Sequence, residues 1–387
     1  MKVRILFLMG VFIFSLAACK KKSVSNHSTV CVNEIHLNEE KYLSSVFESK
    51  IIQLETIDES LIGRKINKIC KRDNKYYISY DNVALVIFDS QGKFLRRINR
   101  IGGGPGDYTL LVDFDVLPDG NIIIQDAKKM LFFSNTGEYI KSIQLGMTCY
   151  NIKVIDEDNF LVCASGEEYS IYLINKDGNI LSKQIKTNNI PVLGRSVTFY
   201  RFGDNTIYQQ DLSNDFLSFN TSTNEFIGMN LLCDKDNVLS IEIVNDYKKR
   251  ENRFNSFDYV EKNPGIKVIN AVSSYADFLL FSLGNSSTGF KFYIMNTSKN
   301  TISHILSENT VDDICFNHNL LSPLLFRTTV SDSDDCLITY LHPYQIIDNF
   351  NKNTEFNEHT NYKHLLSLFK NIQDIENENP VLIELRK

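Results

Sequence analysis

Short apolar segments that follow polar turns recur along this chain and predict its architecture. Six times, a turn rich in Asp or Asn is followed at once by five or six mostly apolar residues. Apolar runs of this length, bounded by turn residues, are typical of β-strands. The six segments cover residues 76–80, 122–126, 160–164, 206–211, 278–283 and 336–341. Six similar strand starts indicate six copies of one supersecondary unit.

A hairpin pattern follows five of these strands. An apolar strand end and a polar turn precede a Gly and then a new apolar strand, at Gly92, Gly137 and Gly178. Gly supplies the positive φ that such a turn needs. Two later copies have Asn224 and Asn300 instead, and Asn is the next best residue for left-handed backbone. Each unit is therefore predicted to be a four-stranded antiparallel blade, and repeated blades predict an all-β, six-bladed β-propeller.

Two segments interrupt this repeat. Residues 233–264 form a polar excursion between blades four and five, and residues 342–379 form a detour within the last blade. Apolar residues at helical spacing in the detour predict a short amphipathic helix on the rim of the propeller. These residues are Leu365, Leu368, Phe369 and Ile372.

The two ends of the chain are predicted to complete one blade together. An apolar strand near residues 51–57 precedes the first full blade, and another at residues 380–385 ends the chain. Pairing of these strands would close the ring and leave only short, protected sheet edges. The propeller is expected to span residues 49–387.

The N-terminal segment predicts export. Two basic residues precede an apolar stretch, residues 5–16, that is too short for a spanning helix. The sequence Leu-Ala-Ala-Cys ending at Cys19 resembles the lipobox of bacterial lipoproteins, which implies cleavage before Cys19 and its acylation with groups such as palmitate. The alternative is an ordinary secretory signal with a chance Cys. We expect a signal peptide over 1–18, and a lipidated Cys with its tether over 19–48.

Composition and charge narrow the class of partner. The chain is 43% hydrophobic and 23% charged, as in ordinary globular proteins. Loss of the signal peptide takes the net charge from −6 to −8, which disfavours nucleic acid as a partner. The basic run at residues 20–22 either touches anionic headgroups beside the lipid or is a solvated tether.

Seven cysteines remain after Cys19. An exported location permits disulfides, and an odd number leaves at least one thiol unpaired. The cysteines are widely scattered without a C-x-x-C pair, which argues against a zinc site. Several lie inside apolar strands, so we expect mostly structural thiols.

The linker between blades one and two carries a family resemblance. Residues 100–108 read Arg-Ile-Gly-Gly-Gly-Pro-Gly-Asp-Tyr, which resembles the G-x-G-P-G-[DE]-Y stretch of the six-bladed, NHL-like β-propeller lipoproteins of Bacteroidota. Residues 379–382, Asn-Pro-Val-Leu, resemble the closing strand of that family. The resemblance implies a propeller on the cell envelope and no established activity. Asp107 stands where that family more commonly has Glu.

The same Gly run supplies the ligand-binding candidates. A phosphate loop would need a following Lys-Ser/Thr at a helix start, which is absent, so a tight crossover between blades is the favoured interpretation. In the alternative, its amides with Arg100 and Tyr108 line one mouth of the channel. Arg195 lies in the crossover between blades three and four, and two such cations could hold an anionic group by bidentate hydrogen bonds. Surface ion pairing is the competing interpretation.

No motif predicts catalysis. The seven His have no metal-binding spacing, and His342, just after a strand, is expected to be structural. The carboxylate-rich turns at 156–158 and 331–335 lack the pattern of a calcium loop and are expected to be solvated. No G-x-S-x-G motif occurs. No catalytic residue, metal or cofactor is therefore expected.

Three functions remain open. The first is a non-catalytic binding or scaffold propeller, anchored by lipid in the outer membrane as a monomer, for a protein or envelope ligand. The second is a propeller hydrolase or lyase acting on glycans or peptides. The third is an accessory sensor of a transport or signalling complex. Lysines rather than acidic residues follow Cys19, which favours the periplasmic face over the cell surface.

Overall fold

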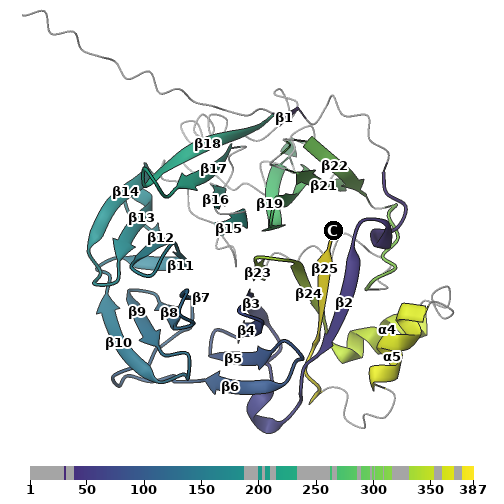
Figure 1. Ribbon diagram of the computed structural model, residues 1–387, viewed down its shortest axis with the longest axis horizontal. Helices are drawn as coiled ribbons and strands as arrows, with labels where there is room; N and C mark the ends of the chain where they lie inside the picture. The colour runs from purple at the N-terminus through teal and green to yellow at the C-terminus, as the bar shows by residue number, and fades with distance from the viewer. Residues whose placement is uncertain are drawn as a thin grey trace, which may run out of the picture.

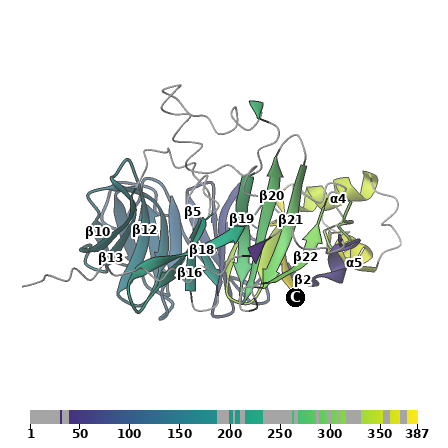
Figure 2. The same cartoon turned by 90° about the horizontal axis from the view of Figure 1, so that it is seen from above.

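In the computed structural model the chain forms a ring of six β-sheets around a central axis (Figure 1). Figure 2 shows the same ring from the side, as a disc with the helices at one edge. The structure describes residues 30–31, 39–186, 199–202, 205–209, 215–232, 262–263, 268–285, 289–296, 299, 301–307, 309–315, 331–352, 360–369 and 377–387.

Blades one to five each contain four antiparallel strands, which are named below in order from the central axis outward. Blade one contains β3 (Ile66–Arg72), β4 (Lys75–Tyr80), β5 (Ala84–Asp89) and β6 (Phe94–Ile98). Blade two contains β7 (Asp113–Val116), β8 (Ile122–Asp126), β9 (Lys129–Phe133) and β10 (Tyr139–Gln144). Blade three contains β11 (Thr148–Val154), β12 (Asn159–Ser165), β13 (Tyr169–Asn175) and β14 (Ile180–Lys186). Blade four contains β15 (Phe199–Phe202), β16 (Asn205–Gln209), β17 (Asp215–Asn220) and β18 (Glu225–Leu232), and blade five contains β19 (Val268–Tyr275), β20 (Phe278–Asn285), β21 (Gly289–Asn296) and β22 (Thr301–Leu306).

Blade six is built from both ends of the chain. Its hydrogen-bonded strands are β24 (Leu337–Leu341), β25 (Val381–Arg386) and β2 (Glu48–Gln53). The short strand β23 (Ser331–Ser333) precedes β24 and pairs in parallel with β3 of blade one. The predicted closure of the ring by the N- and C-terminal strands is confirmed, since β2 pairs with β25 over its whole length.

The repeated sequence pattern corresponds to the second strand of every blade. The six predicted segments form β4, β8, β12, β16, β20 and β24. The hairpin Gly residues also have the expected backbone, because φ is +81° at Gly92, +85° at Gly137 and +86° at Gly178. Asn224 takes the same role with φ of 54°. The prediction of a six-bladed propeller is confirmed.

Apolar side chains fill the wedges between neighbouring blades. On blade one, Tyr76 and Ile78 pack with residues of blade six, whereas Tyr77 and Leu85 pack with residues of blade two. Because successive side chains of a strand point to opposite faces, each sheet buries both of its faces. This explains why the second and third strands are apolar throughout, rather than alternating.

The turn between the third and fourth strands also packs against the preceding blade. The Gly92 carbonyl accepts a hydrogen bond from the Glu55 amide, which follows β2 of blade six, with N and O 2.8 Å apart. Further round the ring, Lys141 of β10 donates to the Lys176 carbonyl in the next turn at 2.8 Å. Corresponding bonds run from Arg96 to the Asn135 carbonyl and from Gln184 to the Asn224 carbonyl. The repeated turn therefore joins blades as well as strands.

Part of the predicted tether is packed on the ring. Strand β1 (Val30–Cys31) pairs in parallel with β18, the outer strand of blade four. Residues 39–47 then run beside blade five, where Glu39 and Tyr42 form isolated bridges. The short helix η1 (Leu43–Ser45) buries Leu43 completely. The segment expected as a tether up to residue 48 thus includes two parts of the fold, β1 on blade four and residues 39–47, whose apolar residues cover blade five.

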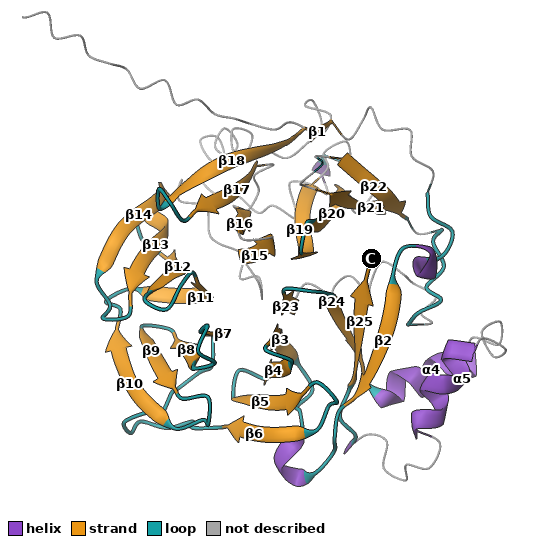
Figure 3. Cartoon of the chain, viewed as in Figure 1, coloured by secondary structure: helices purple, strands orange, loops and turns teal. Residues whose placement is uncertain are grey.

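In its described residues, the detour in blade six contains two helices, both outside the ring (Figure 3). The predicted helix exists as α5 (Thr360–Phe369), which buries Leu365 and Phe369. Helix α4 (Pro343–Lys352) was not predicted. Ile372 and nearly all of the 233–264 excursion lie outside the described residues.

The described cysteines are buried free thiols, as expected. These are the cysteines whose side chains the structure describes: Cys70, Cys149, Cys163, Cys315 and Cys336.

Candidate functional site

Charged side chains gather where the inner strands of blades one, two, three and six meet. Polar residues two positions apart point the same way from each strand. Each of these charged residues is at least nine-tenths buried as a side chain. They are three cations, Lys68, Arg72 and Lys153, and three carboxylates, Asp113, Asp115 and Asp332; we call them the channel cluster.

Two residues of the channel cluster, Lys68 and Asp113, join blades one, two and three. The ammonium nitrogen of Lys68 lies 3.0 Å from Asp113 Oδ1 and 2.6 Å from the Phe114 carbonyl oxygen. Asp113 Oδ2 accepts hydrogen bonds from the Ile152 amide at 2.9 Å and from the side chain of Asn151 at 3.2 Å. One carboxylate on β7 therefore binds groups from the inner strands of both neighbouring blades, β3 and β11.

The other four residues of the cluster form contacts across the axis. Lys153 Nζ lies 2.7 Å from Asp332 Oδ2, and Arg72 Nη2 lies 2.8 Å from Asp332 Oδ1. Asp115 accepts a hydrogen bond from the Val154 amide at 2.8 Å and lies 3.9 Å from Lys153. Blade three is thereby connected to β23, on the far side of the channel (Figure 1).

The buried charges of the cluster neutralise one another. Burial alone would raise the pKa of Asp332, but Arg72, Lys153 and Lys68 together hold it well below its usual range. Burial alone would lower the pKa of Lys68, but the carboxylates around it, Asp113 first, raise it instead. Burial raises the pKa of the Cys70 thiol to about 12, so this thiol is protonated at neutral pH. The Cys70 thiol is therefore not a nucleophile at neutral pH, and the Asp332 carboxylate, held by its cations, is not poised as a general base.

Two carboxylates of the cluster and the neighbouring Cys70 thiol have the spacing of metal ligands. The ligand atoms of Cys70, Asp115 and Asp332 all lie within 4.8 Å of one another. Metal binding requires a thiolate, however, and uncommitted carboxylates. The Cys70 thiol is protonated, and Asp332 already binds two cationic side chains. These residues do not fit a divalent cation.

A second buried charge group joins blade six to blade one. Glu384 of β25 is 1% exposed, and its Oε1 lies 2.7 Å from both Lys71 Nζ and the Tyr76 hydroxyl oxygen. Arg386 lies 2.8 Å from Glu384 Oε2 and 2.8 Å from Asp335. This group stabilises the closure of the ring.

The acidic run at 331–335 is not simply a solvated turn. Asp332 is buried in the channel cluster, and Asp335 binds Lys71 and Arg386. The prediction of a solvated turn was wrong here, because β23 pairs with β3 and places the run against its cations. The run at 156–158 is a turn, in which Asp156 accepts hydrogen bonds from Asn159.

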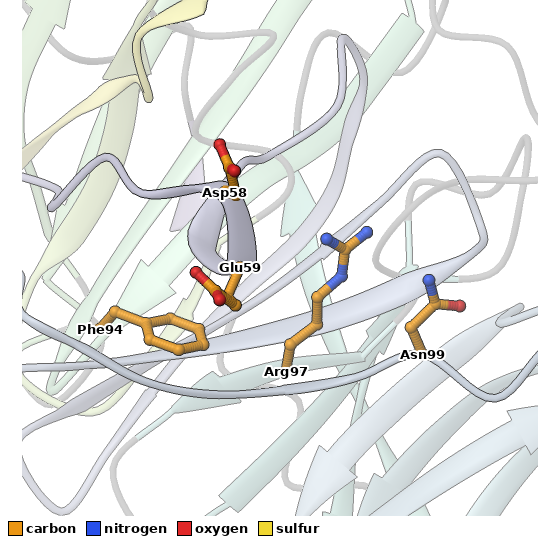
Figure 4. Close-up of a pocket in the computed structure, with 5 residues that line it drawn as sticks. All are labelled: Asp58, Glu59, Phe94, Arg97 and Asn99. Atoms are coloured by element: carbon orange, nitrogen blue, oxygen red, sulfur yellow. The ribbon is translucent and has the colours of Figure 1, made fainter.

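An open depression of about 510 Å³ lies on the outer side of blade one (Figure 4). It is formed where the short helix η2 (Asp58–Ser60) lies beside β6. Figure 4 shows one basic, two acidic, one amide and one aromatic side chain around it. They are Arg97, Asp58, Glu59, Asn99 and Phe94.

Most polar side chains of this depression have no partner among the described residues. Among the described residues, the side chains of Asp58, Glu59 and Asn99 have no hydrogen bond or ion pair. The guanidinium carbon of Arg97 lies 5.5 Å from the centre of the Tyr80 ring, but its buried Nε has no hydrogen-bond partner. Unsatisfied buried polar groups are costly, so the depression is suited to a ligand that supplies the missing acceptor.

The predicted mouth residues lie in the crossover itself. Arg100 follows the outer strand β6, and its Nε lies 3.5 Å from Asp107 Oδ1. Tyr108 is completely buried, and its hydroxyl group lies 2.8 Å from the Val83 carbonyl oxygen and 3.1 Å from that of Ile98. The structure thus gives Tyr108 a position in the core between blades one and two, not one exposed to a channel ligand.

The remaining predicted positions have separate outcomes. Arg195 and Cys19 lie outside the described residues. His342 packs between Tyr340 and Tyr344, at ring-centre distances of 5.6 and 5.5 Å, as expected for a structural residue.

Sequence reasoning did not find the channel cluster or the depression. A signal for the cluster was present, since Lys68, Cys70 and Arg72 alternate along one strand. Asp113 and Asp115 do the same within another. The depression has no such signal, because η2 and β6 are separated by a whole blade in sequence.

The fold and its closure define a six-bladed β-propeller in which the described charges of the channel cluster pair with one another. The chain belongs to the family described as Domain of unknown function (DUF4934), whose model matches residues 29–386. No curated protein matches this sequence.

The solved structures that match this chain include two from Bacteroides. A predicted exported protein from Bacteroides fragilis NCTC 9343 is 15% identical with a TM-score of 0.69, and the match covers 93% of this chain and 99% of that chain. A protein of unknown function from Bacteroides caccae is 14% identical with a TM-score of 0.34, over 62% of this chain and 81% of that chain. Within the described residues, no helix has both the length and the apolar character needed to cross a membrane.

Proposed function

We propose that this protein is a non-catalytic binding propeller, held at the cell envelope by a lipid on Cys19. One contrast carries the proposal. The buried charges of the channel cluster bind one another, whereas the polar groups of the rim depression have no hydrogen bond or ion pair among the described residues, apart from the contact of Arg97 with Tyr80. A surface with polar groups left free by the fold is suited to recognition of another molecule.

The depression favours a protein segment as ligand. Arg97 offers a cation, Asp58 and Glu59 offer anions, and Phe94 offers an apolar surface within one open concavity. Such a mixture fits a peptide stretch that carries both charges better than a polyanion. Arginine beside an aromatic ring is also typical of residues that dominate binding at protein interfaces.

The envelope location is supported by two observations. The leader and lipobox precede the propeller in the sequence. The similar Bacteroides fragilis structure is itself described as a predicted exported protein. We place this chain in the outer membrane facing the periplasm, because lysines follow Cys19.

Binding can be tested by crosslinking of the native envelope and capture with the lipidated protein. We expect Arg97→Ala to reduce capture of the specific partner about tenfold or more. Arg64→Ala is the matched control, because Arg64 is exposed on the same blade and lies outside the depression. Equal capture by both variants, or turnover of a glycan or peptide panel by the pure protein, would overturn the proposed function.

The anchor has a separate test. Metabolic labelling with a palmitate analogue should mark the wild-type chain and not the Cys19→Ser variant. Equal labelling of the two, or none in either, would show that Cys19 is not lipidated.

A further inference from the structure

The outer strands of blades one to four share an exposed aliphatic residue. It lies three positions after the Gly or Asn of each hairpin turn, at the start of the fourth strand. The residues and their exposed fractions are Leu95 37%, Ile140 51%, Leu181 51% and Ile227 41%. On β14 the preceding residue, Ile180, is exposed as well, at 45%.

Blade five departs from this pattern where the chain itself covers the rim. The corresponding residue is Ser303, which accepts a hydrogen bond from Lys387. The N-terminal segment at residues 39–47 lies along this blade. The aliphatic position thus recurs on the rim of blades one to four, away from residues 39–47.

The direction of β1 shows from which side the anchor arrives. Val30 pairs with Leu231, and the two strands are parallel. The N-terminal end of β1 therefore points toward the beginning of β18, where Ile227 lies. Val30 is eleven residues from Cys19 in the sequence, and a fully extended chain of that length spans at most about 40 Å. A lipid on Cys19 keeps the rim of blade four within that distance of the bilayer.

We propose that the rim formed by Ile180, Leu181 and Ile227 rests on the lipid bilayer that holds the anchor. This inference rests on the lipidation of Cys19. Aliphatic side chains at an interface gain by leaving water. Exposed lysines lie beside them on β14, at Lys183 and Lys186, and would attract anionic headgroups together with the lysines that follow Cys19.

Both acidic and basic side chains surround this rim, and they restrict how the propeller can be oriented on the membrane. Lys186 pairs with Glu168 at 3.2 Å, and Glu225 is exposed at the start of β18. The hairpin turns of blades two and three carry further acids, such as Asp119 and Asp177. If the propeller lay flat on the membrane, these acids would be brought against anionic lipid. The proposed contact is therefore confined to the edge of blades three and four.

The absence of Trp from the sequence permits a direct measurement. Single Trp residues can be introduced as Leu181→Trp, Ile227→Trp and Leu95→Trp in the lipidated chain. Leu95 is the matched control, because it has the same repeat position but lies on β6, opposite β18 in the ring (Figure 1). Each variant is bound to vesicles of phosphatidylethanolamine and phosphatidylglycerol that contain brominated lipid.

We expect the fluorescence at positions 181 and 227 to be quenched at least threefold more than at position 95. Flotation of the wild-type protein with vesicles is measured in parallel. If the protein floats but all three positions are equally quenched, or none is, the membrane-facing rim is wrong while the anchor stands. If the wild type does not float, the anchor itself is wrong, and the proposed rim contact is overturned with it.

Discussion

Among the hairpin glycines, Gly92 has the least room for a side chain. Its φ is +81°, and a Cβ there would lie 2.1 Å from the Gln53 carbonyl oxygen of blade six. Gly178 has nearly the same φ, but its nearest neighbour would be 3.6 Å away. The first position therefore combines backbone strain with a steric clash, and the second has strain alone.

We expect Gly92→Ala to lower the free energy of unfolding by about 2 kcal/mol or more, since strain and overpacking both act. Gly178→Ala should cost only about 1 kcal/mol. Urea unfolding of both variants measures the difference. Equal losses would show that the contact between this turn and blade six does not matter for stability.

Asp332 is the carboxylate on which two cations of the channel cluster depend. Its replacement in Asp332→Asn leaves Arg72 and Lys153 buried with one carboxylate fewer, and breaking a buried pair in this way costs about 3–5 kcal/mol. Asp334 is a neighbouring control, because its side chain is half exposed and its ion pair with Arg72 is worth no more than about 1 kcal/mol. Denaturant midpoints compare the two variants, and similar values would contradict a structural role for the cluster.

At the scale of elements, β25 holds the ring closed. Its Glu384 binds Lys71 and Tyr76 of blade one. We expect Glu384→Gln to lower the free energy of unfolding by about 3 kcal/mol, because Lys71 loses its buried counter-ion. Glu48→Gln, on the exposed outer strand β2, should change it by less than about 0.5 kcal/mol. Thermal unfolding distinguishes them, and an unchanged Tm in both would show that the β-pairing alone closes the ring.

The elements differ in how far the sequence predicts them. The second strands and the hairpins were predictable, because a local apolar run and a Gly or Asn at a fixed offset define each one. Strand β23 was not, since Ser331–Ser333 contains no apolar residue and its partner β3 is distant in sequence. The channel cluster depends on that same pairing. Its charges become interpretable only when the strands that carry them are known to meet.

For the molecule as a whole, acid should be the condition that weakens the ring. The pKa of Asp332 lies well below its usual range, and that of Asp335 is lowered to about 2. Carboxyls with lowered pKa in the folded state contribute stability that is complete above about pH 4 and is lost as pH falls toward their folded values. Asp113 acts in the opposite sense, because burial raises its pKa.

We therefore expect the urea concentration at the unfolding midpoint of the wild type to decrease as the pH is lowered below about 4. The midpoint of Asp332→Asn should decrease less steeply over the same range. The measurement is a series of urea titrations between neutral pH and pH 3. Parallel curves for the two proteins would show that Asp332 does not titrate with unfolding.

The pairing of β2 with β25 makes the two ends of the ring neighbours, with Glu48 opposite Arg386. A short linker could join these ends, and new termini could be opened in the exposed turn after β9, residues 134–138. In such a circular permutant the order of blades along the chain changes while the ring does not. A lipid attached to the new N-terminus would then hold blade two, rather than blade four, beside the membrane. The position of the chain termini thus determines which blade of the propeller lies beside the membrane.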